Sequence, residues 1–136
     1  MCGIIGIWGH ENKDAVQTMM QQLVHRGPDA EGMYVSPQGK GVLGHRRLSI
    51  MDPEGGNQPI LNKNQKRAIV ANGEIYNFPQ LRPTLSGKYD FTTTSDSEAI
   101  LHLYQEHGTG VVKHLDGMYA FIVADENNVL AARDPI

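Results

Sequence analysis

Short apolar runs alternate with one amphipathic stretch in the first half of the chain. Residues 3–8 are apolar and rich in β-branched side chains, and they end at Gly9, which predicts a buried strand. Residues 13–24 repeat apolar side chains at helical spacing and predict a helix, which stops at 25–29 because glycine and proline cannot continue it. Residues 31–36 and 41–48 predict two strands joined around 37–39, and residues 52–59 predict a loop.

The second half shows a comparable pattern. Residues 67–71 and 74–76 flank Asn72-Gly73, a dipeptide typical of a hairpin turn. A short helix is predicted over 78–85, and a second helix follows Ser95 and Glu98, which have capping-box spacing, and ends at Gly108. Residues 118–124 are apolar without alternation, as in a strand covered on both faces, and 129–133 predict a last strand.

These elements predict the fold class. Six or seven strands joined by short turns favour antiparallel pairing, and three helices are available to cover the outer faces. We therefore expect one α+β domain with two packed sheets, since 136 residues are enough for one core.

Composition narrows the choice of function and partner. The net charge is −3 and no segment concentrates Lys or Arg, so we expect no nucleic-acid partner. No window approaches 18 apolar residues and no signal peptide is apparent, so we expect no membrane association. A single cysteine suits a reducing compartment and a cytoplasmic location. The six histidines form no metal-ligand pattern, and neither common phosphate-binding loop is present.

Cys2 is the first candidate for chemistry. If Met1 is removed, the chain begins with a thiol and a free α-amine on one residue. An α-amine has a pKa of about 8 and can accept a proton near neutral pH, so one residue then carries a nucleophile and its base. The alternative is that Cys2 is a small buried apolar side chain.

Three other positions also allow two interpretations. Asn72-Gly73 is a hairpin turn, an oxyanion hole made of a side-chain amide and a glycine N–H, or both. Arg46 and Arg47 are either a solvated strand end or a guanidinium fork for a carboxylate. Asp96 belongs to a helix cap or pairs with a substrate ammonium.

Six motifs occur in series, and together they carry a resemblance. They are 2–6 (CGIIG), 25–29 (HRGPD), 47–50 (RLSI), 72–77 (NGEIYN), 95–98 (SDSE) and 116–121 (DGMYAF). The chain resembles the N-terminal glutaminase domain of glutamine-dependent asparagine synthetases, a class II glutamine amidotransferase of the N-terminal-nucleophile hydrolases. The resemblance covers essentially the whole chain.

The resemblance implies a four-layer αββα sandwich of two mainly antiparallel sheets. It implies that Cys2 is the nucleophile and its α-amine the base, with Asn72 and Gly73 forming the oxyanion hole. Glutamine would be held by Arg47 at its carboxylate, by Asp96 and Glu74 at its ammonium, and by backbone near Ile50 and Met51. Arg26 would shape the site rather than touch the substrate.

The resemblance also implies what the chain lacks. We expect residues 1–136 to be a glutaminase domain incomplete at its C-terminus, with a C-terminal synthetase domain as partner. ATP and Mg²⁺ would bind only in that missing domain, so no cofactor is expected here. A homodimer, an acceptor other than aspartate, and a non-catalytic glutamine-binding or regulatory fragment remain open alternatives.

Overall fold

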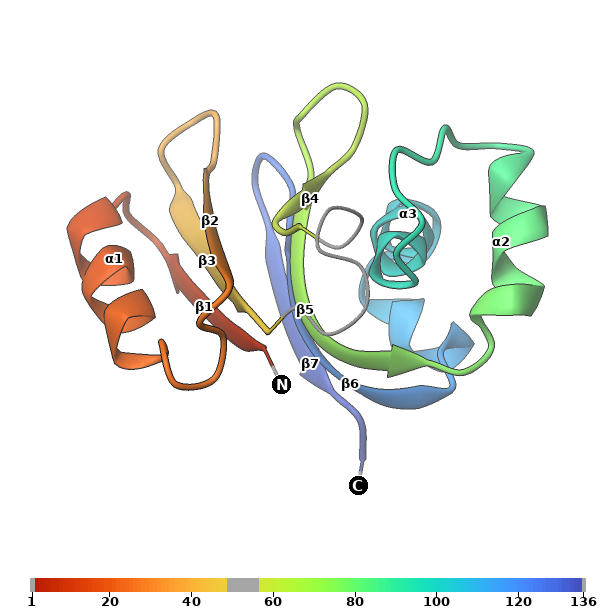
Figure 1. Ribbon diagram of the computed structural model, residues 1–136. Helices are drawn as coiled ribbons and strands as arrows, with labels where there is room; N and C mark the ends of the chain where they lie inside the picture. Colours follow the sequence, from red (N-terminus) through yellow and green to blue (C-terminus); the bar gives the residue numbers. More distant parts are fainter. Residues whose placement is uncertain (1, 49–56, 136) are drawn as a thin grey trace.

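The computed structural model describes residues 2–48 and 57–135, which form two antiparallel sheets with helices outside them (Figure 1). The first sheet contains β1 (Gly3–Trp8), β2 (Ala30–Val35) and β3 (Gly41–Arg47), in the order β1-β3-β2. The second contains β4 (Ile60–Leu61), β5 (Ala68–Ile75), β6 (Gly117–Ala124) and β7 (Val129–Arg133), in that order. The helices are α1 (Lys13–Gln22), α2 (Phe78–Ser86), α3 (Ser97–His107) and a 3₁₀ helix, η1 (Gly108–His114).

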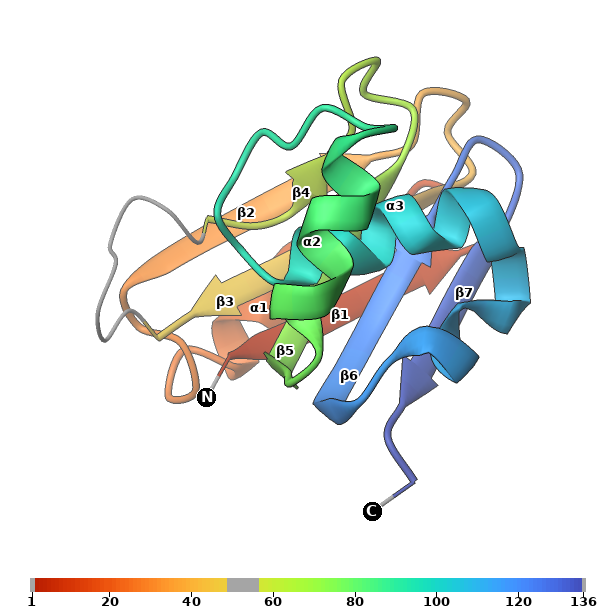
Figure 2. The same ribbon diagram turned by 90° about the vertical axis from the view of Figure 1, so that its right-hand side faces the viewer.

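The layers follow the expected order. Figures 1 and 2 show α1 on the outer face of the first sheet and α2 and α3 on the outer face of the second, with the two sheets packed against each other. The strand pairs within both sheets are antiparallel. This confirms the predicted α+β sandwich with helices on both sides.

The burial of β5 explains why the layers hold together. Ala68 and Val70 face the first sheet and pack in a cluster with Leu43, whereas Ile69 and Ala71 on the other face pack beneath α3. Successive residues of a strand point to opposite faces, so a strand covered on both sides is apolar throughout. A smaller cluster seats Val16 and Met20 of α1 on the first sheet.

The predicted hairpin at Asn72-Gly73 is wrong. β5 continues through both residues, and Asn72 and Gly73 pair with Ala120 and Tyr119 of β6. Gly73 has a φ of 136°, and a Cβ there would collide with the carbonyl oxygen of Met118. The glycine is therefore needed for a close approach between strands, not for a turn.

Other boundaries differ in smaller ways. α1 ends at Gln22 rather than at Val24, because Leu23 already caps it. The capping box is also wrong: Asp96 is the N-cap residue and its side chain makes no cap bond, while Glu98 binds the preceding loop. The two-residue strand β4 was not predicted, since a run that short has no periodicity to detect. In the described ranges, no helix combines the length and apolar character needed to cross a bilayer.

Candidate active site

A cleft of about 790 Å³ brings together six of the eight predicted site residues. The first sheet contributes Cys2, just before β1, and Arg47 at the end of β3. The second sheet and the start of α3 contribute Asn72, Gly73, Glu74 and Asp96. The other two predicted residues, Ile50 and Met51, lie outside the residues that the structure describes.

Cys2 is held at both of its main-chain polar groups. Its nitrogen donates to Asn72 Oδ1 at 3.2 Å, across the gap between the sheets. Its carbonyl oxygen accepts from Arg26 Nε at 3.4 Å. The Asn72 amide is thereby oriented with its oxygen toward the Cys2 nitrogen, so its Nδ2 group is the part that can donate to a ligand.

Arg47 is buried, with 8% of its surface exposed, so the solvated strand end is the wrong interpretation. Its Nη1 donates to Asn57 Oδ1 at 3.1 Å, and its carbonyl oxygen accepts from Asp29 N at 3.0 Å. The neighbouring Arg46 is also buried and binds Gly27 O at 2.9 Å and Glu31 at 2.6 Å. Successive strand residues face opposite ways, so one arginine lines the cleft and the other braces the loop behind it.

That loop is the His25-Arg26-Gly27-Pro28-Asp29 segment. A Cβ on Gly27 would collide with the backbone of Arg46 and Arg47, so only glycine permits this approach. Pro28 also forms an isolated bridge with Arg47. The segment therefore supports Cys2 and Arg47 from behind.

The outer edge of β5 is anchored on both sides of Gly73. Ala71 N donates to Gln58 Oε1 at 2.7 Å, and Ile75 N donates to Asp96 Oδ2 at 2.7 Å. Both N–H groups point away from β6. Main-chain N–H groups alternate in direction along a strand, so the N–H of Gly73, two residues from each of them, points the same way. Across the pair, Tyr119 N donates to Asp134 Oδ2 at 2.8 Å, so it does not bond to Gly73.

His45 ties the two sheets together behind this edge. Its ring is buried, and Nε2 lies 3.2 Å from the carbonyl oxygen of Ala71. Burial lowers the pKa of His45 to about 4; the hydrogen bond to Ala71 opposes the shift and the Arg47 charge adds to it. His45 is therefore neutral near pH 7 and donates its Nε2 proton to Ala71.

The two acidic residues differ in setting. Asp96 is half-buried and already accepts from Ile75 N, but an ionised carboxylate has further acceptor positions. Glu74 is exposed at the rim of the cleft. The cleft thus combines a thiol, an oriented amide, a guanidinium and carboxylates, which suits a small zwitterion that carries an amide.

Sequence reasoning missed several residues that line the same cleft. Gln58 and Asp134 hold main-chain groups of Ala71 and Tyr119, and only the tertiary structure reveals those contacts. The other missed lining residues are Leu48, Ala71, Ser95, Ser97, Met118, Tyr119 and Ala120. Several of them lie inside the motifs quoted above, and that proximity was the only available signal. Over the described part of the chain, no group of His, Cys, Asp or Glu is arranged to hold a metal ion.

Comparison with known proteins defines the class. Residues 1–136 match the family described as "Glutamine amidotransferase domain", and the chain belongs to that family. An asparagine synthetase (glutamine-hydrolysing) of Brassica oleracea is 39% identical over 143 residues, covering 100% of this chain and 24% of that protein. A probable asparagine synthetase (glutamine-hydrolysing) of Dictyostelium discoideum is 43% identical over 145 residues, covering 100% of this chain and 26% of that protein. The chain thus spans about a quarter of the length of these relatives.

Solved structures agree on the fold. The glutamine phosphoribosylpyrophosphate amidotransferase of B. subtilis superimposes with a TM-score of 0.80 at 25% identity, over 99% of this chain and 37% of that one. A structure described as the allosteric regulatory enzyme of purine biosynthesis gives 0.81 at 27% identity, with the same coverage. These are amidotransferases of the N-terminal-nucleophile hydrolase fold, so the predicted fold family is confirmed.

Proposed function

We propose that this chain hydrolyses the side-chain amide of glutamine to glutamate and ammonia, with Cys2 as the nucleophile once Met1 has been removed. The observation that carries the proposal is the convergence of Cys2, Asn72, Gly73, Arg47 and Asp96 on one cleft from both sheets. Membership of the glutamine amidotransferase family supports the choice of substrate.

The first step forms a thioester. The α-amine of Cys2 takes the thiol proton, the sulfur attacks the amide carbon, and ammonia leaves after the nitrogen is protonated. Water then attacks the thioester carbon, which releases glutamate and regenerates the thiol. Removal of Met1 is essential, because an amide nitrogen at Cys2 has no useful basicity.

The oxyanion formed in each step would be stabilised by Asn72 Nδ2 and the Gly73 N–H. Two observations support this role: Asn72 Oδ1 is engaged by the Cys2 nitrogen, and Gly73 lies between two anchored N–H groups. Donors fixed before the reaction are worth more than donors that must reorient, since no reorganisation is needed as charge develops.

Recognition of the amino-acid head falls to opposite sides of the cleft. Arg47 would bind the α-carboxylate of glutamine, because a guanidinium can form two parallel hydrogen bonds with it. Asp96 would bind the α-ammonium with help from Glu74 at the rim. Backbone groups near Ile50 and Met51 stay predicted members of the same pocket.

In a longer protein, the ammonia would be used by a C-terminal synthetase domain to make asparagine from aspartate with ATP. The support is that relatives called asparagine synthetases extend well beyond the matched region. ATP and Mg²⁺ would be bound by that domain. Delivery of ammonia to a different carboxylate remains the alternative for the acceptor.

The nucleophile is tested by covalent labelling. A glutamine analogue carrying a diazo ketone in place of the amide should add to Cys2 alone, and mass analysis of the N-terminus should show that reactive chains have lost Met1. Cys2→Ala should remove both labelling and ammonia release while leaving the melting temperature close to that of the parent. Ammonia release by Cys2→Ala at the parent rate would exclude the proposed nucleophile.

A further inference from the structure

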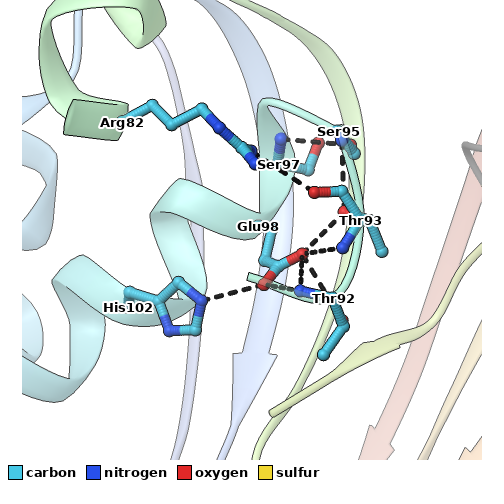
Figure 3. Close-up of polar contacts among 7 residues, drawn as sticks. All are labelled: Arg82, Thr92, Thr93, Ser95, Ser97, Glu98 and His102. Atoms are coloured by element: carbon cyan, nitrogen blue, oxygen red, sulfur yellow. Dashed lines mark hydrogen bonds and ion pairs between the residues drawn. The ribbon is translucent and has the colours of Figure 1, made fainter. Parts of the chain in front are cut away.

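A buried carboxylate behind Asp96 is used by none of the steps above. Glu98, in the first turn of α3, has no exposed surface. Its Oε2 lies 2.9 Å from His102 Nε2 and 2.9 Å from Thr92 N, and its Oε1 accepts from Thr93 N at 2.7 Å and from Thr93 Oγ1 at 2.6 Å (Figure 3). A fully buried carboxylate is costly unless both of its oxygens accept hydrogen bonds, and both oxygens of Glu98 do so.

The charge state of Glu98 agrees with this arrangement. Burial alone raises the pKa of the Glu98 carboxyl, but hydrogen bonds from His102, Thr93 and Thr92 outweigh it and hold the pKa below its ordinary value. The His102 ring is fixed in turn by stacking on Tyr89, at 4.9 Å between centroids, and by edge contact with Phe91. Glu98 is therefore ionised, and together with the His102 ring it forms a rigid anchor in the helical layer of the second sheet.

The hydrogen bonds continue from Glu98 to both neighbours of Asp96. Thr93 Oγ1 donates to Glu98 and accepts from Ser95 N at 3.1 Å. Ser95 Oγ accepts from Ser97 N at 3.2 Å. Figure 3 shows these contacts as one chain running from His102 through Glu98 and Thr93 to Ser95 and Ser97.

We propose that Glu98 is a positioning residue for the amino-acid head of the substrate, acting through Thr93 and Ser95 to fix the backbone on both sides of Asp96. The inference rests on the proposed function, because Asp96 is assigned there to the substrate ammonium. Ser95, Asp96 and Ser97 all line the cleft, and the Asp96 carboxylate is held from the other side by Ile75 N. Asp96 is thus fixed between β5 and the Glu98 anchor.

A set of isosteric variants separates positioning from general stability. Thr93→Val removes the hydroxyl that joins Glu98 to Ser95 and keeps the side-chain shape, whereas Thr93→Ser keeps the hydroxyl. Thr92→Val is the matched control, because Thr92 Oγ1 lies 3.5 Å from Glu98 and passes no bond to Ser95. Val16→Ala is the stability control, since Val16 of α1 is fully buried against the first sheet, away from Glu98.

Two electrophiles then report on Cys2. The diazo-ketone analogue carries the amino-acid head of glutamine, and chloroacetamide does not. We expect Thr93→Val to slow labelling of Cys2 by the diazo-ketone analogue about tenfold, because Glu98 loses one hydrogen-bond partner. Labelling by chloroacetamide should be unchanged. In Thr93→Ser, the rate of labelling by the diazo-ketone analogue should lie within about twofold of the parent rate. The controls Thr92→Val and Val16→Ala should not change the ratio of the two labelling rates.

The outcomes are distinct. If Thr93→Val leaves the ratio of the two labelling rates unchanged, whether both rates fall equally or neither falls, the positioning role of Glu98 is overturned. If Thr93→Val does not fold, His102→Gln carries the same test, because it weakens the anchor while keeping a donor for Glu98. Failure of the proposed function gives a separate result. In that case the parent protein itself would react no faster with the diazo-ketone analogue than with chloroacetamide.

Discussion

The two walls of the cleft are built in different ways. The first wall, Cys2 and Arg47, rests on the 25–29 loop. Arg47 makes main-chain contacts with this loop, where Gly27 lets the backbones approach closely, and the Cys2 carbonyl oxygen accepts from the Arg26 side chain. The second wall, Asn72 to Glu74 and Ser95 to Ser97, is supported by polar side chains, namely the half-buried Gln58 and Asp96 and the fully buried Glu98.

The difference indicates how each wall responds to substitution. Main-chain contacts are insensitive to most side-chain changes, so variants in the first wall should act through the group that is removed. The loss of a side-chain anchor also affects its neighbours, because it leaves a main-chain N–H without its acceptor. Chemistry and positioning are therefore easier to separate in the first wall than in the second.

The expected effect with the largest upper limit lies in the first wall, at Arg47. Arg47→Ala should raise the KM for glutamine at least about thirtyfold, because losing one partner of a buried charged contact costs roughly 2–5 kcal/mol. Arg47→Lys should recover only part of this, since an ammonium cannot form the paired bonds of a guanidinium. Steady-state assays give both values, with Arg67→Ala as control, because Arg67 is not among the residues that line the cleft. An unchanged KM in Arg47→Ala would remove Arg47 from substrate binding.

Asn72 tests the second wall. Asn72→Asp keeps an oxygen for the Cys2 nitrogen but loses the Nδ2 donor, so kcat should fall about 10²–10³-fold. KM should change less, because the donor acts mainly on the charge that develops in the transition state. The same substitution at the exposed Asn127 should leave both constants unchanged. A rise in KM with kcat unchanged would assign Asn72 to ground-state binding instead.

The stability of the fold should depend on pH through His45, which lies in the first sheet and binds Ala71 of the second. The unfolded chain binds a proton at His45 near pH 6.5, whereas the folded protein does so only near 4, so acidification across this window favours unfolding. The loss at pH 4 should approach about 3 kcal/mol. Urea melts between pH 7 and 4 measure it. His45→Gln, which retains a donor for Ala71, should flatten the curve in this window; an equally steep curve would assign the effect to other groups.

The smallest effect is expected at the rim of the first wall. Glu31→Gln removes the ion pair with Arg46, but the Glu31 side chain is 45% exposed, so the free energy of unfolding should fall by less than about 1 kcal/mol. Arg46 keeps its bond to Gly27 O, and the 25–29 loop should stay in place. Thermal melts and the KM for glutamine check this. A large rise in KM would show that the first wall also depends on side-chain anchors.

Much of the fold was predictable from local pattern. The strands β1, β2, β3, β6 and β7 and the three α-helices lie within two residues of their expected positions, because burial on one or both faces leaves a periodic record in the sequence. The candidate site was predictable in another way, through the family resemblance that the six short motifs carry. Six of those residues line one cleft.

What local pattern could not reveal depends on partners far along the chain. Asn72-Gly73 favours a hairpin on its own, but β6, more than 40 residues later, offers a longer ladder of hydrogen bonds and turns the same residues into strand. Ser95 and Glu98 favour a capping box, but the Thr92 and Thr93 N–H groups and His102 satisfy the carboxylate more completely. The sequence by itself determined the elements and the reactive groups. The tertiary structure decided their partners, because hydrogen bonds and burial between distant segments outweigh local preference.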